Sequence, residues 1–192
     1  MNAGEYFVHP LAVVDEGSEI GEGTRIWHWC HIMPDCKIGK KCNIGESSFI
    51  ESGVVLGNNV KVKNNVALYT GVTCEDNVFL GPNCVFTNVI NPRSFIERKH
   101  EFKKTIIHEG ATIGANATIV CGHDIGRYAF VGAGSVVTKS VPDYVMVLGN
   151  PAKWYAYVCK CGCQLNESLE CESCGNRYKK EADGSIIPIK EI

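Results

Sequence analysis

The sequence predicts an all-β protein that winds into a parallel β-helix, and its periodicity carries that prediction. Every sixth residue from Val8 to Phe86 is apolar, and the same spacing returns from Ile107 to Val137. The position four residues after each of these is mostly small or β-branched. An α-helix would need apolar residues every three or four positions, and an ordinary strand every second position. A six-residue period over this length is the signature of a parallel β-helix.

Corner residues are the third observation. In most hexapeptides the position three after the large apolar residue is a residue that tolerates positive φ. These are Gly17, Gly23, Asp35, Gly53, Asn59, Asn65, Gly71, Asn77 and Asn83. Short edges joined by such corners form a prism, and three edges per coil would stack residues 18 apart at about 4.8 Å.

Interior positions account for several cysteines. Cys30, Cys36, Cys42 and Cys84 occupy the small position, and Cys74 occupies the large apolar one. We expect all five to be buried as compact hydrophobic side chains. His123 also falls on a small interior position, where we expect a hydrogen-bonded core residue.

The chain divides into a β-helix over residues 1–142, a connecting segment at 143–158 and a cysteine-rich tail at 159–192. Residues 88–105, NVINPRSFIERKHEFKKT, interrupt the hexapeptides as an extended inserted loop and form the most basic stretch. Loops of this length are usually functional or disordered. A solvated loop and an arm that meets phosphates or carboxylates are the two interpretations.

Composition excludes some classes of function. The net charge of −2 argues against a dedicated nucleic-acid-binding protein, which would carry a basic face. The N-terminus lacks the basic and apolar regions of a secretory signal, and no apolar run approaches membrane-spanning length. We therefore expect a cytoplasmic protein without membrane insertion.

Two columns of stacked residues are candidate ligand-binding sites. Glu51, Tyr69 and Thr87 lie 18 apart, so they should stack beneath the point where the insert leaves, beside Asn88. Unlike the asparagines at corners, Asn88 has no conformational reason to be asparagine. In the second run Ala115 stacks under Ala133, which leaves backbone open to a flat ligand such as a pantetheine arm. The alternative is that small residues merely fit tight corners.

The tail holds two closely spaced cysteine pairs, CKC and CESC, each near a glycine. They resemble the knuckles of a zinc ribbon, in which four thiolates hold a structural Zn²⁺. The expected ligands are Cys159, Cys161, Cys171 and Cys174, with Cys163 as a substitute. Reduced free cysteines on a packed hairpin are the alternative.

The hexapeptides, the basic insert and the segments GANATIVCG, VGAGSVVTKSVP and LGNPAK resemble the hexapeptide acyltransferase superfamily. That resemblance implies a left-handed β-helix, a homotrimer and acetyl-CoA bound between neighbouring prisms. The segments VHPLAVVDEGSEIGEGTRIWHWCHI, KNNVALYTGV and FTNVINPRSFIERK are similar to the UDP-2-acetamido-3-amino-2,3-dideoxy-D-glucuronate N-acetyltransferases. These enzymes acetylate a UDP-linked amino sugar for bacterial surface polysaccharide, such as the O-antigen of lipopolysaccharide.

Residue roles follow from the resemblance. Asn88 stands where many hexapeptide acyltransferases have a catalytic histidine, and an amide cannot act as a general base. We therefore expect Asn88 to orient the amine or the thioester carbonyl, with Glu51, Tyr69 and Thr87 around the substrate. His100 and His108 are the alternative bases.

Charged residues complete the expected sites. Arg93 and Arg98 are candidates for the uronate carboxylate and the UDP phosphates, which guanidinium binds in a bidentate way. For acetyl-CoA, Ala115 and Ala133 would supply backbone contacts, and Lys139 and Lys153 would meet its phosphates or adenine end.

Other functions stay open. A hexapeptide enzyme could acetylate another amino sugar or a hydroxyl group. A γ-type carbonic anhydrase would need three converging histidines, which the spacing does not supply. A non-enzymatic β-helix scaffold is the remaining alternative.

Overall fold

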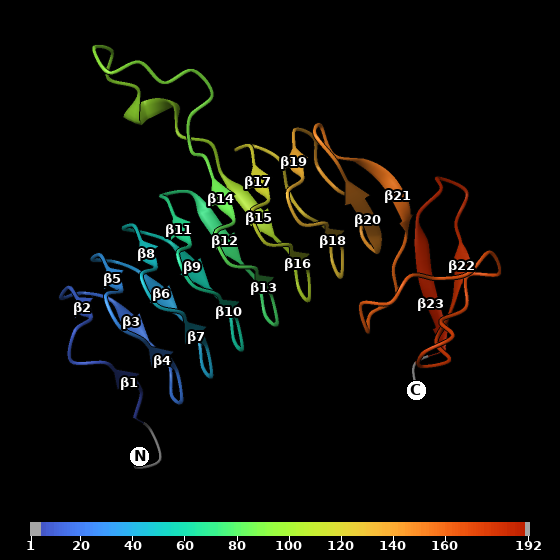
Figure 1. The fold of residues 1–192 in the computed structure, drawn as a ribbon, viewed down its shortest axis with the longest axis horizontal. Helices are drawn as coiled ribbons and strands as arrows, with labels where there is room; N and C mark the ends of the chain where they lie inside the picture. The colour runs from blue at the N-terminus through green and yellow to red at the C-terminus, as the bar shows by residue number, and fades with distance from the viewer. Residues whose placement is uncertain (1–4, 191–192) are drawn as a thin grey trace.

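A computed structural model describes residues 5–190 and confirms the predicted fold: a left-handed parallel β-helix of about eight turns. Successive coils stack along one axis from the N-terminal end to the tail (Figure 1). Three sheets, parallel except for the last strand of face A, form the faces of the prism and are called faces A, B and C. Among residues 5–190 there is no helix whose length and apolar character would let it traverse a bilayer.

From Phe7 to Ile119 each coil contributes one short strand to each face. Face A contains β1 (Phe7–Val8), β4 (Arg25–Ile26), β7 (Asn43–Ile44), β10 (Lys61–Val62), β13 (Phe79–Leu80), β16 (Thr112–Ile113), β18 (Phe130–Val131), β20 (Val145–Leu148) and β21 (Lys153–Tyr157). Face B contains β2 (Val13–Val14), β5 (His31–Ile32), β8 (Phe49–Ile50), β11 (Ala67–Leu68), β14 (Val85–Phe86), β17 (Thr118–Ile119) and β19 (Val136–Val137). Face C contains β3 (Glu19–Ile20), β6 (Lys37–Ile38), β9 (Val55–Leu56), β12 (Val72–Cys74) and β15 (Thr105–Ile107). Beyond β15, face C continues in the described chain only as the isolated bridges of Ile125 with Ile107 and Val141.

Register follows the predicted 18-residue spacing. Phe7 pairs with Arg25, and Lys61 pairs with Phe79. Across the insert the partners lie 33 apart, as for Val85 and Thr118, because the insert adds residues without adding a coil. All nine predicted corner residues have positive φ, between 57° at Asn59 and 101° at Gly71.

The interior is filled as the periodicity predicts. Ile26, Ile32, Ile44, Ile50 and Leu68 are fully buried, and the five predicted interior cysteines are no more than 1% exposed. His123 is the exception, since it is only half-buried and Cys121 is buried nearby instead. The expectation for His123 is therefore wrong: the chain between β17 and Ile125 follows a different path, which turns this side chain outward.

Polar side chains in the small interior position form a regular ladder. Each donates to the carbonyl oxygen 15 residues later, on the next coil. The pairs are Ser18–Met33 (2.7 Å), Thr24–Gly39 (2.7 Å), Cys30–Gly45 (3.0 Å), Cys36–Glu51 (3.2 Å), Cys42–Gly57 (3.1 Å) and Ser48–Lys63 (3.1 Å). These bonds give the corner carbonyls a side-chain donor, although the Glu51 carbonyl also accepts from the Val54 N–H at 3.3 Å.

This ladder predicts that two buried cysteines respond differently to serine. Cys36→Ser keeps a hydroxyl within reach of the Glu51 carbonyl, so we expect a loss in unfolding free energy below about 1 kcal/mol. The Cys74 thiol has no polar partner among the described residues, so Cys74→Ser should lose about 1–3 kcal/mol. Chemical denaturation of both variants measures the difference, and equal losses would contradict the role given to the ladder.

The insert and the two ends complete the fold. Residues between β14 and β15 leave the prism as an arm that contains one short 3₁₀ helix, η1 (Lys99–Glu101), and stands out beside the N-terminal coils (Figure 1). Residues 143–158, described above as a connection, contribute β20 and β21 to face A. The tail folds around the hairpin of β22 (Arg177–Lys180) and β23 (Ile186–Lys190).

Candidate functional site

The corner between faces B and C carries the predicted column. Glu51, Tyr69 and Thr87 each directly follow a strand of face B, on three successive coils. The Glu51 N–H donates to the Leu68 carbonyl at 2.8 Å, and the Thr87 N–H donates to the Ile119 carbonyl at 3.1 Å. These ladder bonds fix the corner as a rigid support below the insert.

Glu51 and Tyr69 differ in how they are held. The Glu51 carboxylate accepts a hydrogen bond from the Thr70 N–H at 2.7 Å, so one of its oxygens orders the corner itself. Tyr69 is half-buried and its ring lies 6.2 Å from the Phe49 ring, centroid to centroid. Its hydroxyl has no hydrogen-bond partner within residues 5–190, so it is available to a ligand.

Asn88 lies where the arm joins the prism. Its carbonyl accepts a hydrogen bond from the Lys103 N–H at 2.8 Å, which closes the base of the insert. Beside it, the Thr87 hydroxyl accepts from the Cys121 N–H at 2.9 Å. The Asn88 amide is half-buried and bonds to no other described residue. The backbone is therefore fixed while the amide group remains available.

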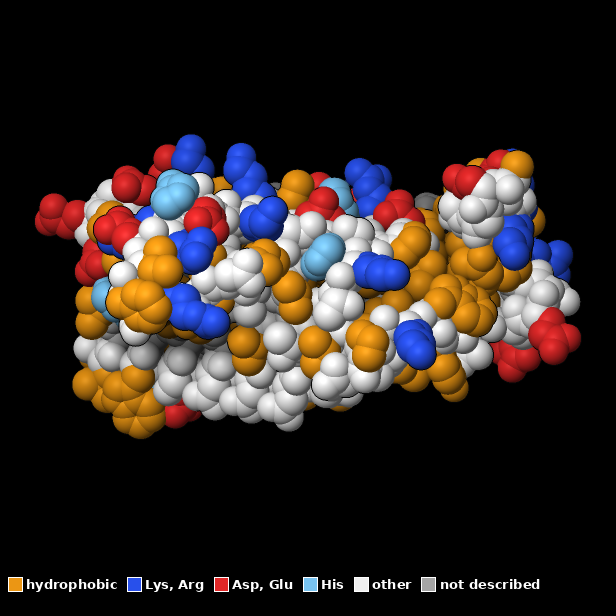
Figure 2. Space-filling view, turned by 90° about the horizontal axis from the view of Figure 1, so that it is seen from above, with side chains coloured by type: hydrophobic (Ala, Val, Ile, Leu, Met, Phe, Trp, Pro, Cys, Tyr) orange, Lys and Arg blue, Asp and Glu red, His pale blue; other side chains and the backbone are white. Residues whose placement is uncertain are grey.

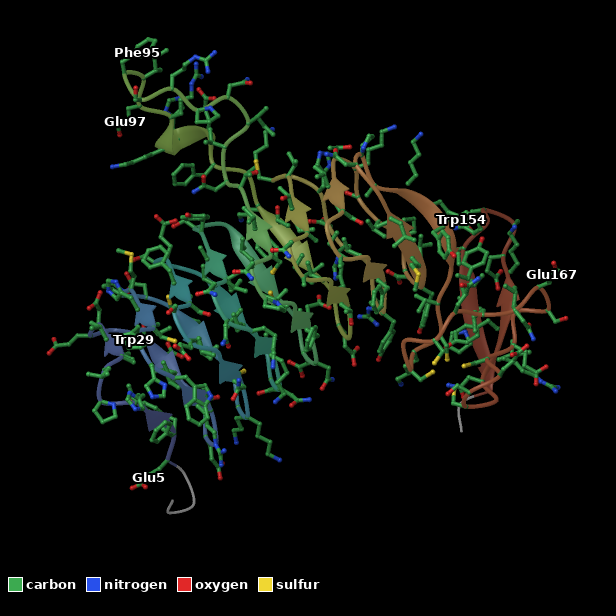
Figure 3. The ribbon with its side chains drawn as sticks, viewed as in Figure 1. Glu5, Trp29, Phe95, Glu97, Trp154 and Glu167 are labelled. Atoms are coloured by element: carbon green, nitrogen blue, oxygen red, sulfur yellow. The ribbon has the colours of Figure 1, made fainter. Side chains whose placement is uncertain are left out.

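Both predicted arginines lie on the arm, beyond this corner. Arg93 is exposed, and Arg98 donates to Glu101 Oε1 at 2.7 Å. The Nε of Arg98 is buried without a partner in the described chain, beside a hollow of about 320 Å³ within the arm. Phe95 and Glu97 mark the tip, which points away from the prism (Figure 3). The arm thus presents cationic groups above the corner, one of them already paired.

The predicted alanines lie at a different corner, between faces A and B. Ala115 follows β16 and Ala133 follows β18, and the Gly134 N–H donates to the Ala115 carbonyl at 2.8 Å. A Cβ at Gly81 would lie 2.7 Å from the Ala115 nitrogen. A Cβ at Gly114 would overlap the Ala133 nitrogen. The coils therefore approach closely here; Ala133 is exposed, and Gly114 and Ala115 are half-buried.

The two predicted lysines, Lys139 and Lys153, lie near different corners of the prism. Lys153 pairs opposite Leu148 at the start of β21, near the corner of the alanines. Lys139 follows β19 and lies toward the corner between faces B and C. Both are exposed. Within one chain, the alanine corner and the Asn88 corner are the two edges of face B.

The structure also shows a pair that the sequence reasoning missed, at the corner between faces C and A. His108 Nδ1 lies 3.1 Å from Glu75 Oε1, and the other oxygen of Glu75 accepts from the Glu109 N–H at 2.9 Å. Partial burial raises the pKa of Glu75, but the Glu109 N–H and His108 outweigh it, so the pKa lies below its usual value. Glu75 and His108 are 33 residues apart. The 18-residue stacking interval does not relate them, because the insert lies between them in the sequence.

Side-chain chemistry is unevenly spread over the molecule. Figure 2 shows the face of the molecule from which the insert projects. Lysines and arginines are scattered over this face, and hydrophobic side chains gather toward the tail. His100 is exposed on η1, and its Nε2 lies 3.6 Å from Glu101 Oε1. His100 and His108 therefore lie on different parts of the molecule.

Two family models of hexapeptide repeats match parts of the chain. The family model "bacterial transferase hexapeptide (six repeats)" matches residues 17–52, and "hexapeptide repeat of succinyl-transferase" matches residues 36–70 and 104–139. The matched segments are hexapeptide repeats, and the chain resembles the acyltransferases built from such repeats.

Individual relatives agree with that class. A dTDP-3-amino-3,6-dideoxy-alpha-D-galactopyranose 3-N-acetyltransferase from Aneurinibacillus thermoaerophilus is 51% identical over 91 residues, which are 46% of each chain. A galactoside O-acetyltransferase from Lactococcus lactis is 35% identical over 43% of this chain and 41% of its own. These matches span less than half of either relative.

A solved structure supports the fold alone. The UDP-N-acetylglucosamine acyltransferase from Campylobacter jejuni superposes with a TM-score of 0.51 at 15% identity, covering 78% of this chain and 74% of its own.

Proposed function

We propose that this protein is an acetyl-CoA-dependent N-acetyltransferase that acetylates the 3-amino group of a nucleotide-linked amino sugar. The observation that carries the proposal is the Asn88 corner, where an available amide and the Tyr69 hydroxyl lie beneath a basic arm. The relative that acts on a dTDP-linked 3-amino sugar supports the acceptor class. The resemblance of FTNVINPRSFIERK narrows the acceptor to UDP-2-acetamido-3-amino-2,3-dideoxy-glucuronate.

The arm suits such an acceptor. Diphosphate and uronate groups are anions that guanidinium binds well. Arg93 is exposed, while the buried Nε of Arg98 has no partner within residues 5–190. A nucleotide in the hollow of the arm would place its phosphates near these groups and its sugar toward Asn88.

The chemistry needs positioning more than a strong base. The neutral amine attacks the thioester carbon, the new C–N bond forms, and the C–S bond of acetyl-CoA breaks. The departing thiolate takes the proton released by the nitrogen, which gives CoA and the amide. Asn88 orients the amine or the carbonyl, and backbone N–H groups stabilise the oxyanion.

A homotrimer would complete the site. In one chain the alanine corner and the Asn88 corner are separated by face B. Prisms packed side by side would bring the alanine corner of one subunit next to the Asn88 corner of another, with acetyl-CoA between them. Exposed apolar side chains on the outer surface, among them Val13, Val85 and Phe95, suit such packing. None of the eleven cysteines, all of which lie within residues 5–190, forms a disulfide, which is typical of a reducing compartment, and we place the reaction in the cytoplasm.

One observation favours a second candidate, O-acetyl transfer. A hydroxyl acceptor needs a general base, and a histidine held by a carboxylate can serve as one. His108 and Glu75 form such a pair, and one relative acetylates the hydroxyl of a galactoside.

Thiol release from acetyl-CoA tests both functions. The acceptor panel pairs UDP- and dTDP-linked 3-amino sugars with their 3-hydroxyl analogues, each with and without the uronate carboxylate. We expect turnover with amino acceptors, at least tenfold higher kcat/KM with the uronate, and a mass of three chains in solution. Release only with hydroxyl acceptors would support the second candidate. No release above background with any acceptor would overturn the proposal.

A further inference from the structure

Four cysteine thiols of the tail converge on one point. The Sγ atoms of Cys159, Cys161, Cys171 and Cys174 all lie within 4.8 Å of one another. The pairs Cys159–Cys174 and Cys161–Cys171 are each 3.5 Å apart, far longer than the S–S bond of about 2.05 Å in a disulfide. The fifth tail cysteine, Cys163, is exposed and lies outside this cluster.

This spacing matches a tetrahedral thiolate site. Four sulfurs at about 2.3 Å from a central ion are separated by about 3.8 Å from one another. Two of the thiols come from the segment that follows β21, and two from the segment that precedes β22. An ion at the centre would therefore link these two segments of the chain, which no disulfide links.

Neighbouring donors suit a negatively charged cluster. The Tyr178 hydroxyl donates to Cys159 Sγ at 3.3 Å, and the Asn176 amide donates to it at 3.8 Å. Hydrogen bonds to sulfur orient metal ligands and offset part of the charge of four thiolates.

The cluster is built into the interface between tail and prism. Cys159 and Cys171 are buried in a second hydrophobic core with Tyr144 and Tyr178. The Tyr144 ring, from the last coil, lies 5.3 Å from the Tyr178 ring and is stacked at 5.3 Å on Tyr128. The tail thus covers the end of the β-helix, where the last coil would otherwise expose apolar surface. Repeat architectures need such end caps.

We propose that Cys159, Cys161, Cys171 and Cys174 bind one Zn²⁺ as four thiolates, and that this ion holds the tail as a cap on the last coil. Binding releases the thiol protons and needs no oxidant, because Zn²⁺ has no redox chemistry. Four protein ligands leave no position for substrate, so the ion is structural and independent of acetyl transfer.

Metal analysis of the full chain, purified without chelator, tests the proposal. We expect one zinc per chain in the unmodified protein and in Cys163→Ser, which is the matched control from the same segment. Cys161→Ser and Cys174→Ser, at an exposed and a half-buried ligand, should retain less than a tenth of the zinc. Protein without zinc, or ligand variants that hold as much zinc as Cys163→Ser, would overturn the site. One iron per chain would overturn the choice of metal.

Hydrogen exchange tests the cap, using the unmodified chain so that misfolding of a variant does not decide the result. Removal of the metal by a chelator should speed amide exchange at least tenfold in β20, β21 and β22, while β4 to β11 stay unchanged. Added Zn²⁺ should restore the slow exchange. Exchange that is equally slow with and without metal would overturn the capping role.

Discussion

Replacement of Asn88 by alanine is expected to lower kcat for acetyl transfer by well over tenfold. Its amide is half-buried at the base of the arm and bonds to no other described residue, so its loss should leave the fold intact. The hydrogen bond that closes the insert comes from the Asn88 backbone and survives the substitution. A tenfold change corresponds to about 1.4 kcal/mol of transition-state stabilisation, and removal of one oriented donor typically costs about 2.7–4 kcal/mol. Thiol release under saturating substrates measures it.

His108→Asn is the control for this prediction. If Asn88 positions the reacting groups and no histidine acts as a base, kcat should fall only slightly in His108→Asn. The side chain would still contact Glu75 through a hydrogen bond, so the corner between faces C and A should be kept. Unchanged turnover in Asn88→Ala together with a collapse in His108→Asn would transfer the chemistry to the His108–Glu75 pair.

Gly114→Ala is expected to cause the largest loss of stability among single substitutions at the corners. A Cβ there would overlap the Ala133 nitrogen, and backbone on the next coil cannot move aside as a flexible side chain can. Overpacking costs about 1–3 kcal/mol, occasionally more, and we expect the upper end of that range here, with a clear fall in Tm and in unfolding free energy. Thermal and denaturant unfolding measure both quantities.

Gly53→Asn is the matched control. Gly53 has a φ of +78°, and a Cβ there would meet no atom within 4 Å. Asn59 and Asn65, at the same position of their hexapeptides, have positive φ values of 57° and 59°. We therefore expect a change within about 1 kcal/mol. If Gly114→Ala were as mild as Gly53→Asn, the close stacking of coils at the alanine corner would be refuted.

The columns of the candidate site were predictable because the fold is periodic. Once residues 18 apart are known to stack, Glu51, Tyr69 and Thr87 must follow one another along a corner. The convergence of the four tail cysteines was likewise predictable, because each closely spaced pair is a local sequence pattern that resembles a zinc knuckle. What the columns do chemically stays a prediction, as does the role of each residue at the alanine corner.

Other contacts between residues could not be predicted from the six-residue and 18-residue periods. The insert shifts the register from 18 to 33, so Glu75 and His108 meet although no simple period relates them. His123 fits the small interior position by number, yet Cys121 is the buried side chain. In both places the path of the chain departs from the hexapeptide rule.

By itself the sequence determined the three-sided coil, its corners and its interior, because each hexapeptide encodes one edge through local preferences and burial. Only the tertiary structure decided how the coils resume after the insert, that face A continues through β20 and β21, and that the tail covers the last coil. These features depend on contacts between residues with no shared period, and such contacts are settled by packing in three dimensions.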